Sequence, residues 1–509
     1  MRTSTFLFLL GLFTLFSSCT EKQPAQVTTT FCDAIHRNDS VSLSAELKQM
    51  EAKLNAQTGV YVLEDGSGSM VARAWLSEYA EKTIDIQYFI FSTDNVGLIA
   101  CDYLVRAAQR GVKVRILVDD IMVDADAEDI LKFSSHENIE LKIYNPGVNL
   151  GKNLLQKVKK FTTEFRDANK RMHNKTFIVD GKVVITGGRN IADEYFDYDH
   201  EYNFRDRDIL MLGKETAAVT SSFEEFWNSE LSLDADLVIQ SNKDHDPEVI
   251  YHTLHEYACN PENFWPQVRT RIENLPSTFS AIKNSGKLKW LDNVKFISDI
   301  PGKNDGENGL AGGGVTTSAL IELVQNAKTS VVIQTPYLIT TELSQNLFRA
   351  AVERGVEVKI LTNSLASTDN VEAFASYQSD RDTLLGTGVR IFEFKPDAEI
   401  RKQIMTGELQ ADLEYQPIFG LHAKSLVVDN EITVVGTFNL DPRSANLNTE
   451  CIVVVKSKDI ASGVLTGIEE EMLPENAWEI TTEFNPDSEV GNYKRLKTWT
   501  RKVLPKGIL

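Results

Sequence analysis

Two stretches of similar sequence, Met172–Asp180 (MHNKTFIVD) and Leu421–Asp429 (LHAKSLVVD), carry the same polar residues at the same spacing. In each stretch a histidine is followed by a lysine two residues later and by an aspartate seven residues later. An asparagine follows each histidine after seventeen residues, at Asn190 and Asn439. Packing requirements alone do not repeat so many polar positions, so the pattern indicates a duplicated functional motif.

The repeat extends to the surrounding elements. An alternating, β-branched run precedes a helical stretch and a second apolar run in each half. The matched segments are Thr83–Ile90 with Arg110–Leu117, and Ser330–Tyr337 with Arg354–Leu361. Strand, helix and strand in this order imply parallel pairing. We therefore expect an α/β fold with two pseudo-symmetric domains, each a mixed, largely parallel sheet flanked by helices.

The predicted domain boundaries follow from these repeats. Residues 1–19 are expected to be a signal peptide and residues 20–50 a tether. The first domain is predicted over residues 51–235 and the second over 300–475. The polar, proline-containing segment 236–299 is predicted to be a linker or insertion, and residues 476–509 a C-terminal extension.

The residue types of the motif suit the chemistry of a phosphate diester. Residues two apart in a strand face the same side, so each histidine should project together with its lysine. If the two halves meet, they form a cleft with two fixed positive charges. One imidazole can then attack phosphorus while the other protonates the departing alkoxide. Glu201 and Glu450, each 28 residues after a histidine, are the acids expected to orient the two rings.

Several longer strings resemble the phospholipase D superfamily, and its bacterial cardiolipin synthase C branch in particular. They are Ile86–Ile90 (IQYFI), Arg171–Lys175 (RMHNK), Gly187–Phe196 (GGRNIADEYF), Ile360–Ala366 (ILTNSLA) and Phe438–Ser444 (FNLDPRS). The resemblance runs from about residue 60 to the C-terminus and implies two phospholipase D-type domains that share one active site.

This resemblance assigns roles to the matched residues. It implies that His173 is the nucleophile that becomes phosphorylated and that His422 is the acid. The catalytic set implied in this way is His173, Lys175, Asp180, His422, Lys424 and Asp429, with the two aspartates described as structural supports of the motif. Lys175, Asn190, Lys424 and Asn439 are expected to bind the substrate phosphate. No cofactor or metal is expected, because the two lysines already provide a positive field.

The function implied by the resemblance is phosphatidyl transfer, with cardiolipin made from phosphatidylglycerol and a second phospholipid. A phospholipase D hydrolase that releases phosphatidic acid would use the same residues and is the main alternative. A phosphodiesterase or nuclease, and a membrane scaffold without activity, remain further alternatives. The net charge of −20 opposes a nucleic-acid partner, because such binding depends on basic residues.

The N-terminus resembles a bacterial lipoprotein signal. Arg2 precedes a short apolar run from Phe6 to Phe16, and small residues lead to Cys19. Cleavage would leave Cys19 as the lipid anchor, so we expect an exported, membrane-anchored lipoprotein that faces the periplasm of a bacterial envelope. An ordinary secretory signal or a short membrane anchor is the alternative.

A second membrane contact is suggested by residues 152–175, which are rich in lysine and arginine and place apolar residues near one helical face. A solvated scaffold helix explains the same pattern. Whether the enzyme requires a helper protein is left open. Of the cysteines that would remain after cleavage, Cys101 and Cys451 lie in apolar segments and are expected to be buried thiols. Spacing alone leaves open whether any of Cys32, Cys101, Cys259 and Cys451 form a disulfide.

Overall fold

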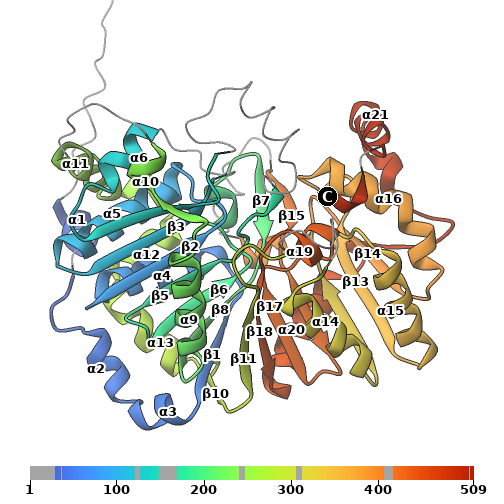
Figure 1. Ribbon diagram of the computed structural model, residues 1–509, viewed down its shortest axis with the longest axis horizontal. Coiled ribbons are helices and arrows are strands. Elements are labelled where there is room, and N and C mark those ends of the chain that lie inside the picture. The colour runs from blue at the N-terminus through green and yellow to red at the C-terminus, as the bar shows by residue number, and fades with distance from the viewer. Residues whose placement is uncertain are drawn as a thin grey trace, which may run out of the picture.

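The computed structural model describes most of the chain, and Figure 1 shows it as two halves that lie side by side. The described residues are 29–35, 37–120, 127–147, 169–239, 247–304, 312–405, 416–503 and 505–508. Each half contains one large sheet with helices on its outer face. The expected α/β architecture with two pseudo-symmetric domains is confirmed.

The first sheet is built from strands of the N-terminal half and one later strand. Its members are β1 (Thr58–Leu63), β2 (Thr83–Tyr88), β3 (Lys113–Asp119), β4 (Ile139–Tyr144), β5 (Thr176–Val179), β6 (Val183–Gly187), β8 (Asp208–Gly213), β9 (Ser232–Asp234) and β10 (Lys289–Leu291). Their order across the sheet is β10-β1-β8-β6-β5-β2-β3-β4-β9.

The second sheet repeats the central part of this order. Its members are β11 (Val294–Ser298), β12 (Ser330–Gln334), β13 (Glu357–Asn363), β14 (Arg390–Phe394), β16 (Ser425–Val428), β17 (Ile432–Gly436), β18 (Cys451–Lys456) and β19 (Ala477–Ile480). They are arranged β11-β18-β17-β16-β12-β13-β14-β19. The run β8-β6-β5-β2-β3-β4 therefore corresponds to β18-β17-β16-β12-β13-β14. A short parallel pair, β7 (Tyr202–Arg205) with β15 (Ile418–Leu421), joins the two halves.

The expectation that each sheet is largely parallel was wrong. Within the two large sheets, parallel pairing of the described strands is confined to β2–β3, β3–β4, β12–β13 and β13–β14, and the other pairs are antiparallel. The crossover helices impose parallel pairing only where they occur. The motif strands instead form hairpins, β5–β6 and β16–β17, whose tight turns need no crossover.

The core is layered. The outer face of the first sheet packs against helices that include α4 (Gly66–Tyr79) and α5 (Asn95–Gln109). In the second half α14 (Val315–Asn326), α15 (Glu342–Glu353) and α16 (Val371–Leu385) take the corresponding position. The inner faces of both sheets share one apolar cluster with α9 (Thr216–Trp227) and α20 (Lys458–Glu471). This shared layer fixes the two halves against each other.

The segment between the predicted domains is folded onto the first half. Its helices α11 (Pro247–Ala258), α12 (Pro266–Glu273) and α13 (Thr278–Asn284) bury apolar residues in the first core. Strands β10 and β11 then enter the first and second sheets in turn. The second sheet therefore begins before residue 300, and β19 extends it beyond residue 475.

Part of the predicted tether is also folded. Helices α1 (Thr29–Ile35), α2 (Leu43–Lys48) and α3 (Glu51–Ala56) lie at the start of the described chain, and Phe31 and Leu43 are buried in the first core. Residues 1–28, including Cys19, lie outside the described residues. In the described part, no helix is both long enough and apolar enough to cross a bilayer.

The remaining short elements are α6 (Ala127–Phe133), α10 (Ala235–Val238), α17 (Arg401–Ile404), α19 (Pro442–Asn446) and the 3₁₀ turns η2 (Asp193–Tyr195), η3 (Pro261–Asn263), η4 (Leu275–Ser277), η5 (Pro486–Glu489) and η6 (Lys506–Ile508). The last α-helix of the described chain, α21 (Asn492–Arg501), packs on α16.

Candidate active site

The two motifs meet at the junction of the halves, where each lies directly before its strand, β5 or β16. Backbone contacts across the junction position them. His173 N–H donates to the Thr449 carbonyl at 3.0 Å, and Thr449 N–H donates to Arg171 at 2.9 Å. In the other half His422 N–H donates to the Arg205 carbonyl at 2.8 Å. Each histidine is therefore held by backbone of the opposite half.

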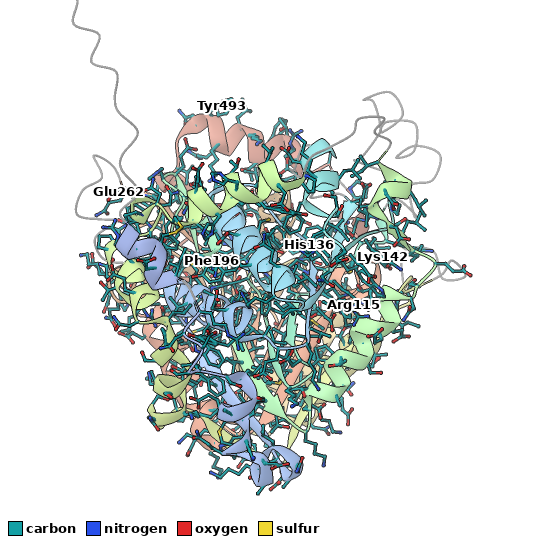
Figure 2. All side chains as sticks on the ribbon, turned by 90° about the vertical axis from the view of Figure 1, so that its left-hand side faces the viewer. Arg115, His136, Lys142, Phe196, Glu262 and Tyr493 are labelled. Atoms are coloured by element: carbon teal, nitrogen blue, oxygen red, sulfur yellow. A yellow bond between two sulfur atoms is a disulfide. The ribbon has the colours of Figure 1, made fainter. Side chains whose placement is uncertain are left out.

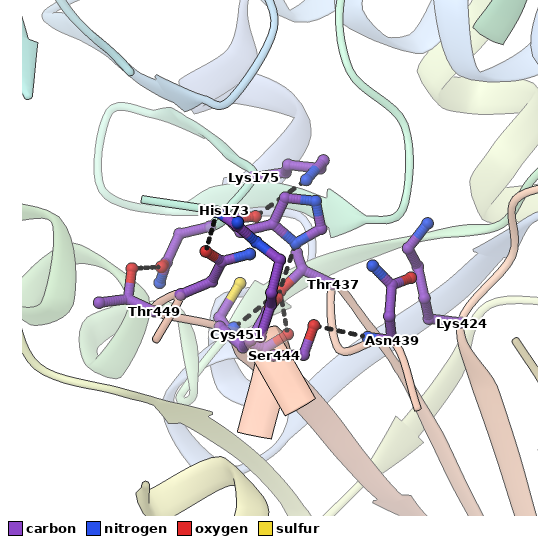
Figure 3. A network of polar contacts seen from close by, with 12 residues as sticks. His173, Lys175, Lys424, Thr437, Asn439, Ser444, Thr449 and Cys451 are labelled. Atoms are coloured by element: carbon purple, nitrogen blue, oxygen red, sulfur yellow. Dashed lines mark hydrogen bonds and ion pairs between the residues drawn. The ribbon is translucent and has the colours of Figure 1, made fainter. Parts of the chain in front are cut away.

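Each imidazole is also paired with an acid from the opposite half, and Figure 3 shows His173 within its network of polar contacts. The Nδ1 of His173 lies 2.8 Å from a carboxylate oxygen of Glu450. The Nδ1 of His422 lies 2.6 Å from a carboxylate oxygen of Asp206. When Nδ1–H donates to the acid, the Nε2 lone pair is left for chemistry. Neither half can therefore form a complete site without the other.

The expectation that Glu201 orients a histidine was wrong. Glu201 is exposed, and the acid at His422 is Asp206. The strand register shows the true equivalence: Asp206 lies two residues before the partner of Gly187, and Glu450 lies two residues before the partner of Gly436. The connection from the motif asparagine to the acid is five residues longer in the first half, sixteen residues against eleven. Equal spacing along the chain therefore selected the wrong acid.

A signal for Asp206 was present in the sequence. In both halves the acid precedes an apolar strand by one or two residues, at Asp208–Gly213 and Cys451–Lys456. The residues behind the acids differ. A Cβ on Gly188 would lie 2.0 Å from Asp206 Oδ1, so glycine is required there. At the matching position Thr437 donates its hydroxyl to Glu450 at 2.5 Å. The longer acid thus accepts a hydrogen bond from a hydroxyl, and the shorter one packs directly against the glycine backbone.

The two lysines lie beside the histidines, inside the protein. Lys175 Nζ donates to the His173 carbonyl at 2.9 Å, and Lys424 Nζ donates to the His422 carbonyl at 2.6 Å. Burial lowers the pKa of Lys175 to about 8, although the charge of Glu450 opposes the shift. Burial lowers the pKa of Lys424 to about 7; the charge of Asp206 opposes the shift, and that of Lys175 adds to it. An anionic phosphate between them would restore both charged forms.

The pKa values of both histidines are lowered, which favours their uncharged forms. Burial lowers the pKa of His173 to about 4; Glu450 opposes the shift, and the charge of Lys175 adds to it. Burial lowers the pKa of His422 to about 3, with Lys424 adding to the shift and Asp206 opposing it. The charges of Lys424 and Lys175 each act on the histidine of the other half, so both imidazoles lie in one electrostatic site. The two residues are only 6% and 5% exposed.

Aromatic edges and amides complete the site. Phe89 meets His173 edge-on, and Tyr195 meets His422 in the same way, with ring centroids 5.0 and 5.1 Å apart. Asn190 Oδ1 accepts the backbone N–H of Ile90 at 3.1 Å. The buried side-chain oxygen of Asn439 has no partner among the described residues and could accept a hydrogen bond from a substrate hydroxyl.

Asp180 and Asp429 do not reach the reacting groups, in keeping with the supporting role that the resemblance implies for them. They lie at the opposite ends of β5 and β16 from the histidines. Asp180 accepts the backbone N–H groups of residues 81–83, at 2.7 to 3.3 Å. Asp429 accepts those of residues 328–330 in the same way, at 2.7 to 3.1 Å. Each aspartate thus ties its motif strand to the start of the neighbouring strand.

Other expected residues lie outside this site. Cys19 and residues 152–168 of the basic stretch fall outside the described residues. Cys101 is partly buried, Cys451 is fully buried beside the site, and both are free thiols. Cys32 and Cys259 form a disulfide that joins α1 to the end of α11.

Comparison with known proteins identifies the family. Residues 77–227 and 320–471 match the family described as "Cardiolipin synthase, PLD-like domain". These ranges cover more than half of the chain and both motifs. The chain therefore belongs to the PLD-like cardiolipin synthase family, which confirms the resemblance drawn from the motif strings.

Individual relatives agree with this assignment. Cardiolipin synthase C of Escherichia coli (strain K12) is 32% identical over 412 residues, which cover 80% of this chain and 83% of that protein. An uncharacterized protein of Helicobacter pylori (strain J99) is 33% identical over 407 residues, 79% of this chain and 77% of the relative. The solved structure of phosphatidylserine synthase from Haemophilus influenzae matches 91% of this chain and 100% of its own, with a TM-score of 0.59 and 15% identity. That last match shows the fold.

Proposed function

We propose that this enzyme is a phosphatidyltransferase that joins two phospholipids, making cardiolipin from phosphatidylglycerol and a second phospholipid. One observation carries the proposal. Two histidine–lysine pairs from different halves face one site, and each imidazole is paired with an acid of the opposite half. This arrangement supplies a nucleophile, a proton donor and two cations around one phosphodiester.

The reaction divides into two transfers. In the first, Nε2 of His173 attacks phosphorus, the bond from phosphorus to the leaving oxygen breaks, and His422 gives its proton to that oxygen. The negative charge of the bound phosphodiester raises the pKa of His422 and so favours the protonated form that this step needs. In the second, neutral His422 takes a proton from the acceptor hydroxyl, whose oxygen attacks phosphorus and releases His173. Glu450 and Asp206 hold the two rings in the tautomer that presents Nε2.

Burial supports transfer to an alcohol over hydrolysis. The histidines are 6% and 5% exposed, so bulk water has little access to the phosphorylated intermediate. An acceptor lipid that fills the site would exclude water further. Phosphatidylglycerol and a second phospholipid therefore remain the proposed substrates, and no helper protein is invoked in either transfer.

A product assay tests the proposal. Purified enzyme is incubated with vesicles of phosphatidylglycerol and phosphatidylethanolamine, and the lipids are resolved by mass spectrometry. We expect cardiolipin together with the released head-group alcohol. Phosphatidic acid as the sole product would replace this proposal with a hydrolase, and cleavage of DNA without lipid turnover would replace it with a nuclease.

The nucleophile is tested separately by trapping the intermediate. Enzyme quenched without acid should carry the phosphatidyl group on His173, and His422→Gln should slow its discharge. Peptide mass spectrometry locates the group. Modification of His422 instead would exchange the roles of the two histidines.

We further propose that the protein is exported and anchored by a lipid on Cys19. The disulfide between Cys32 and Cys259 supports this location, because disulfides persist in oxidising compartments. Labelling cells with a radioactive fatty acid should mark the native protein and leave Cys19→Ser unlabelled. Recovery of unlabelled native protein with both cysteines reduced would place it in a reducing compartment instead. Contact of residues 152–175 with the membrane remains a prediction.

A further inference from the structure

The C-terminal helix α21 carries large apolar side chains on the face that points away from the protein. Tyr493, Leu496 and Trp499 are 83%, 60% and 68% exposed, and Val503, just beyond the helix, is 83% exposed. At 100° per residue the first three fall within about 120° of one helical face. Figure 2 shows Tyr493 at the outer edge of the molecule. An exposed apolar group of this size marks an interaction site.

The inner face of α21 is held to the second domain by polar contacts. Lys494 Nζ donates to the backbone carbonyls of Ala366 and Thr368, at 3.4 and 3.2 Å. Arg501 pairs with Glu372 of α16 at 3.0 Å. Thr498 is buried. The helix therefore turns its polar side inward and its apolar side outward, the reverse of an ordinary surface helix.

The charge of α21 identifies the surface that it fits. The helix contains Lys494, Arg495, Lys497 and Arg501 and no acidic residue, on a protein whose net charge is −20. Tryptophan and tyrosine with flanking cations are typical of helices that lie in the interface of an anionic bilayer. A second copy of the chain is disfavoured, because pairing two such helices would bring eight positive charges together.

The inner face of α21 contacts a loop that reaches the active site. Lys494 binds the loop after β13, residues 364–370. The same loop carries Asp369, which accepts a hydrogen bond from Tyr337 at 2.8 Å and acts electrostatically on Lys424. In Figure 1, α21 projects on the side of the molecule where β7 and β15 join the halves, opposite α2 and α3.

We propose that α21 is a membrane-docking helix, whose outward apolar face inserts into the interface of an anionic phospholipid bilayer and holds the active site against it. The inference goes beyond phosphatidyl transfer. It rests on that proposed function only because a phospholipid substrate makes a phospholipid bilayer the expected surface. The lipid on Cys19 would tether the chain; α21 would set its orientation.

Vesicle sedimentation tests this docking. All variants are made in the full chain with Cys19→Ala, so that acylation cannot contribute. We expect Leu496→Ser, Trp499→Ser and Val503→Ser together to weaken binding to phosphatidylglycerol vesicles at least about tenfold, because apolar burial in the interface is lost. The matched control, Leu237→Ser with Val249→Ser and Val315→Ser, replaces side chains that are 69%, 64% and 55% exposed elsewhere and should bind normally.

A second variant tests the charge. Arg495→Glu with Lys497→Glu should weaken binding to phosphatidylglycerol vesicles and reduce its dependence on salt, while weak binding to phosphatidylcholine vesicles changes little. Unchanged vesicle binding by the apolar variant would overturn the proposal. A change in oligomeric state without a change in vesicle binding would assign the face to a second copy instead.

Activity separates this proposal from the proposed reaction. On short-chain phosphatidylglycerol below its micelle concentration, the α21 variants should turn over as fast as the parent, which also shows that they fold. On vesicles they should be slower. If no form turned over lipid but the binding difference remained, phosphatidyl transfer would fail and membrane docking would stand.

Discussion

At the scale of single residues, each half of the protein provides the acid that pairs with the histidine of the other half. Glu450 holds His173 and Asp206 holds His422, at 2.8 and 2.6 Å. The acids are not identical, and neither are the residues behind them, Thr437 and Gly188. Such differences give two otherwise identical imidazoles different environments. A site in which one imidazole is the nucleophile and the other the proton donor requires this difference.

Replacing Asp206 should impair catalysis without unfolding the protein. In Asp206→Asn the amide can donate to His422 and so favour the wrong tautomer, and we expect kcat to fall about 10²- to 10⁴-fold. The control is Glu201→Gln, which should retain activity within about twofold because Glu201 is exposed. Turnover of short-chain phosphatidylglycerol is the measurement. Equal losses in both variants would contradict the assignment of Asp206.

The pKa values of the two lysines predict how activity falls at alkaline pH. With pKa values of about 8 and 7, Lys175 and Lys424 lose their charges as pH rises through this range, and binding of an anionic phosphate weakens. We expect kcat/KM to decline above about pH 7 and more steeply above about pH 8, while kcat declines at higher pH, because bound phosphate raises both pKa values. Stopped assays across pH 6 to about 10 measure both profiles. A flat kcat/KM to pH 10 would contradict this reading.

At the scale of elements, a motif strand is tied to its neighbour by one aspartate. Asp429 has a positive φ of 54° and directs its carboxylate to the backbone N–H groups that begin β12. Asp180 does the same for β2. The spacing of seven residues between histidine and aspartate therefore spans a short strand, with the histidine before the strand and the anchoring aspartate directly after it.

Asp429→Ala should lower the stability of the protein and leave its catalytic rate largely unchanged. We expect the free energy of unfolding to fall by about 1–3 kcal/mol, because three N–H groups lose a charged acceptor. The kcat of the folded fraction should change by less than about tenfold, since Asp429 does not touch the reacting groups. Urea denaturation followed by circular dichroism measures the first effect. Asp397→Ala, at an exposed position, is the control; equal midpoints for the two variants would argue against the anchor.

At the scale of the whole molecule, buried charges join the halves beneath the site. Arg205 of the first half pairs with Glu471 of the second at 2.6 Å, and their side chains are 2% and 1% exposed. Arg207 reaches Gln334 at 2.5 Å and Ser425 at 2.6 Å. These contacts lie in the shared layer that brings the two motifs together, so stability and catalysis depend on the same junction.

Breaking this pair should loosen the junction. Arg205→Met leaves Glu471 buried without its cation, and we expect a loss of about 3–5 kcal/mol. The double variant Arg205→Met with Glu471→Leu should recover much of this loss, because no buried charge remains unpaired. Thermal and urea unfolding of the three proteins measure the effect. A double variant as unstable as the single would show that the methionine, and not the stranded carboxylate, is responsible.

The sequence by itself determined the duplication, the α/β class, the family and the histidine, lysine and asparagine positions, because these residues recur at fixed spacing on short strands whose period is two. Only the tertiary structure decided which acid serves His422, since Asp206 is selected by strand register across a longer connection. Only the tertiary structure also showed that most pairings in the sheets are antiparallel and that α21 faces outward. Register and facing arise from contacts between distant segments, which spacing along one chain does not encode.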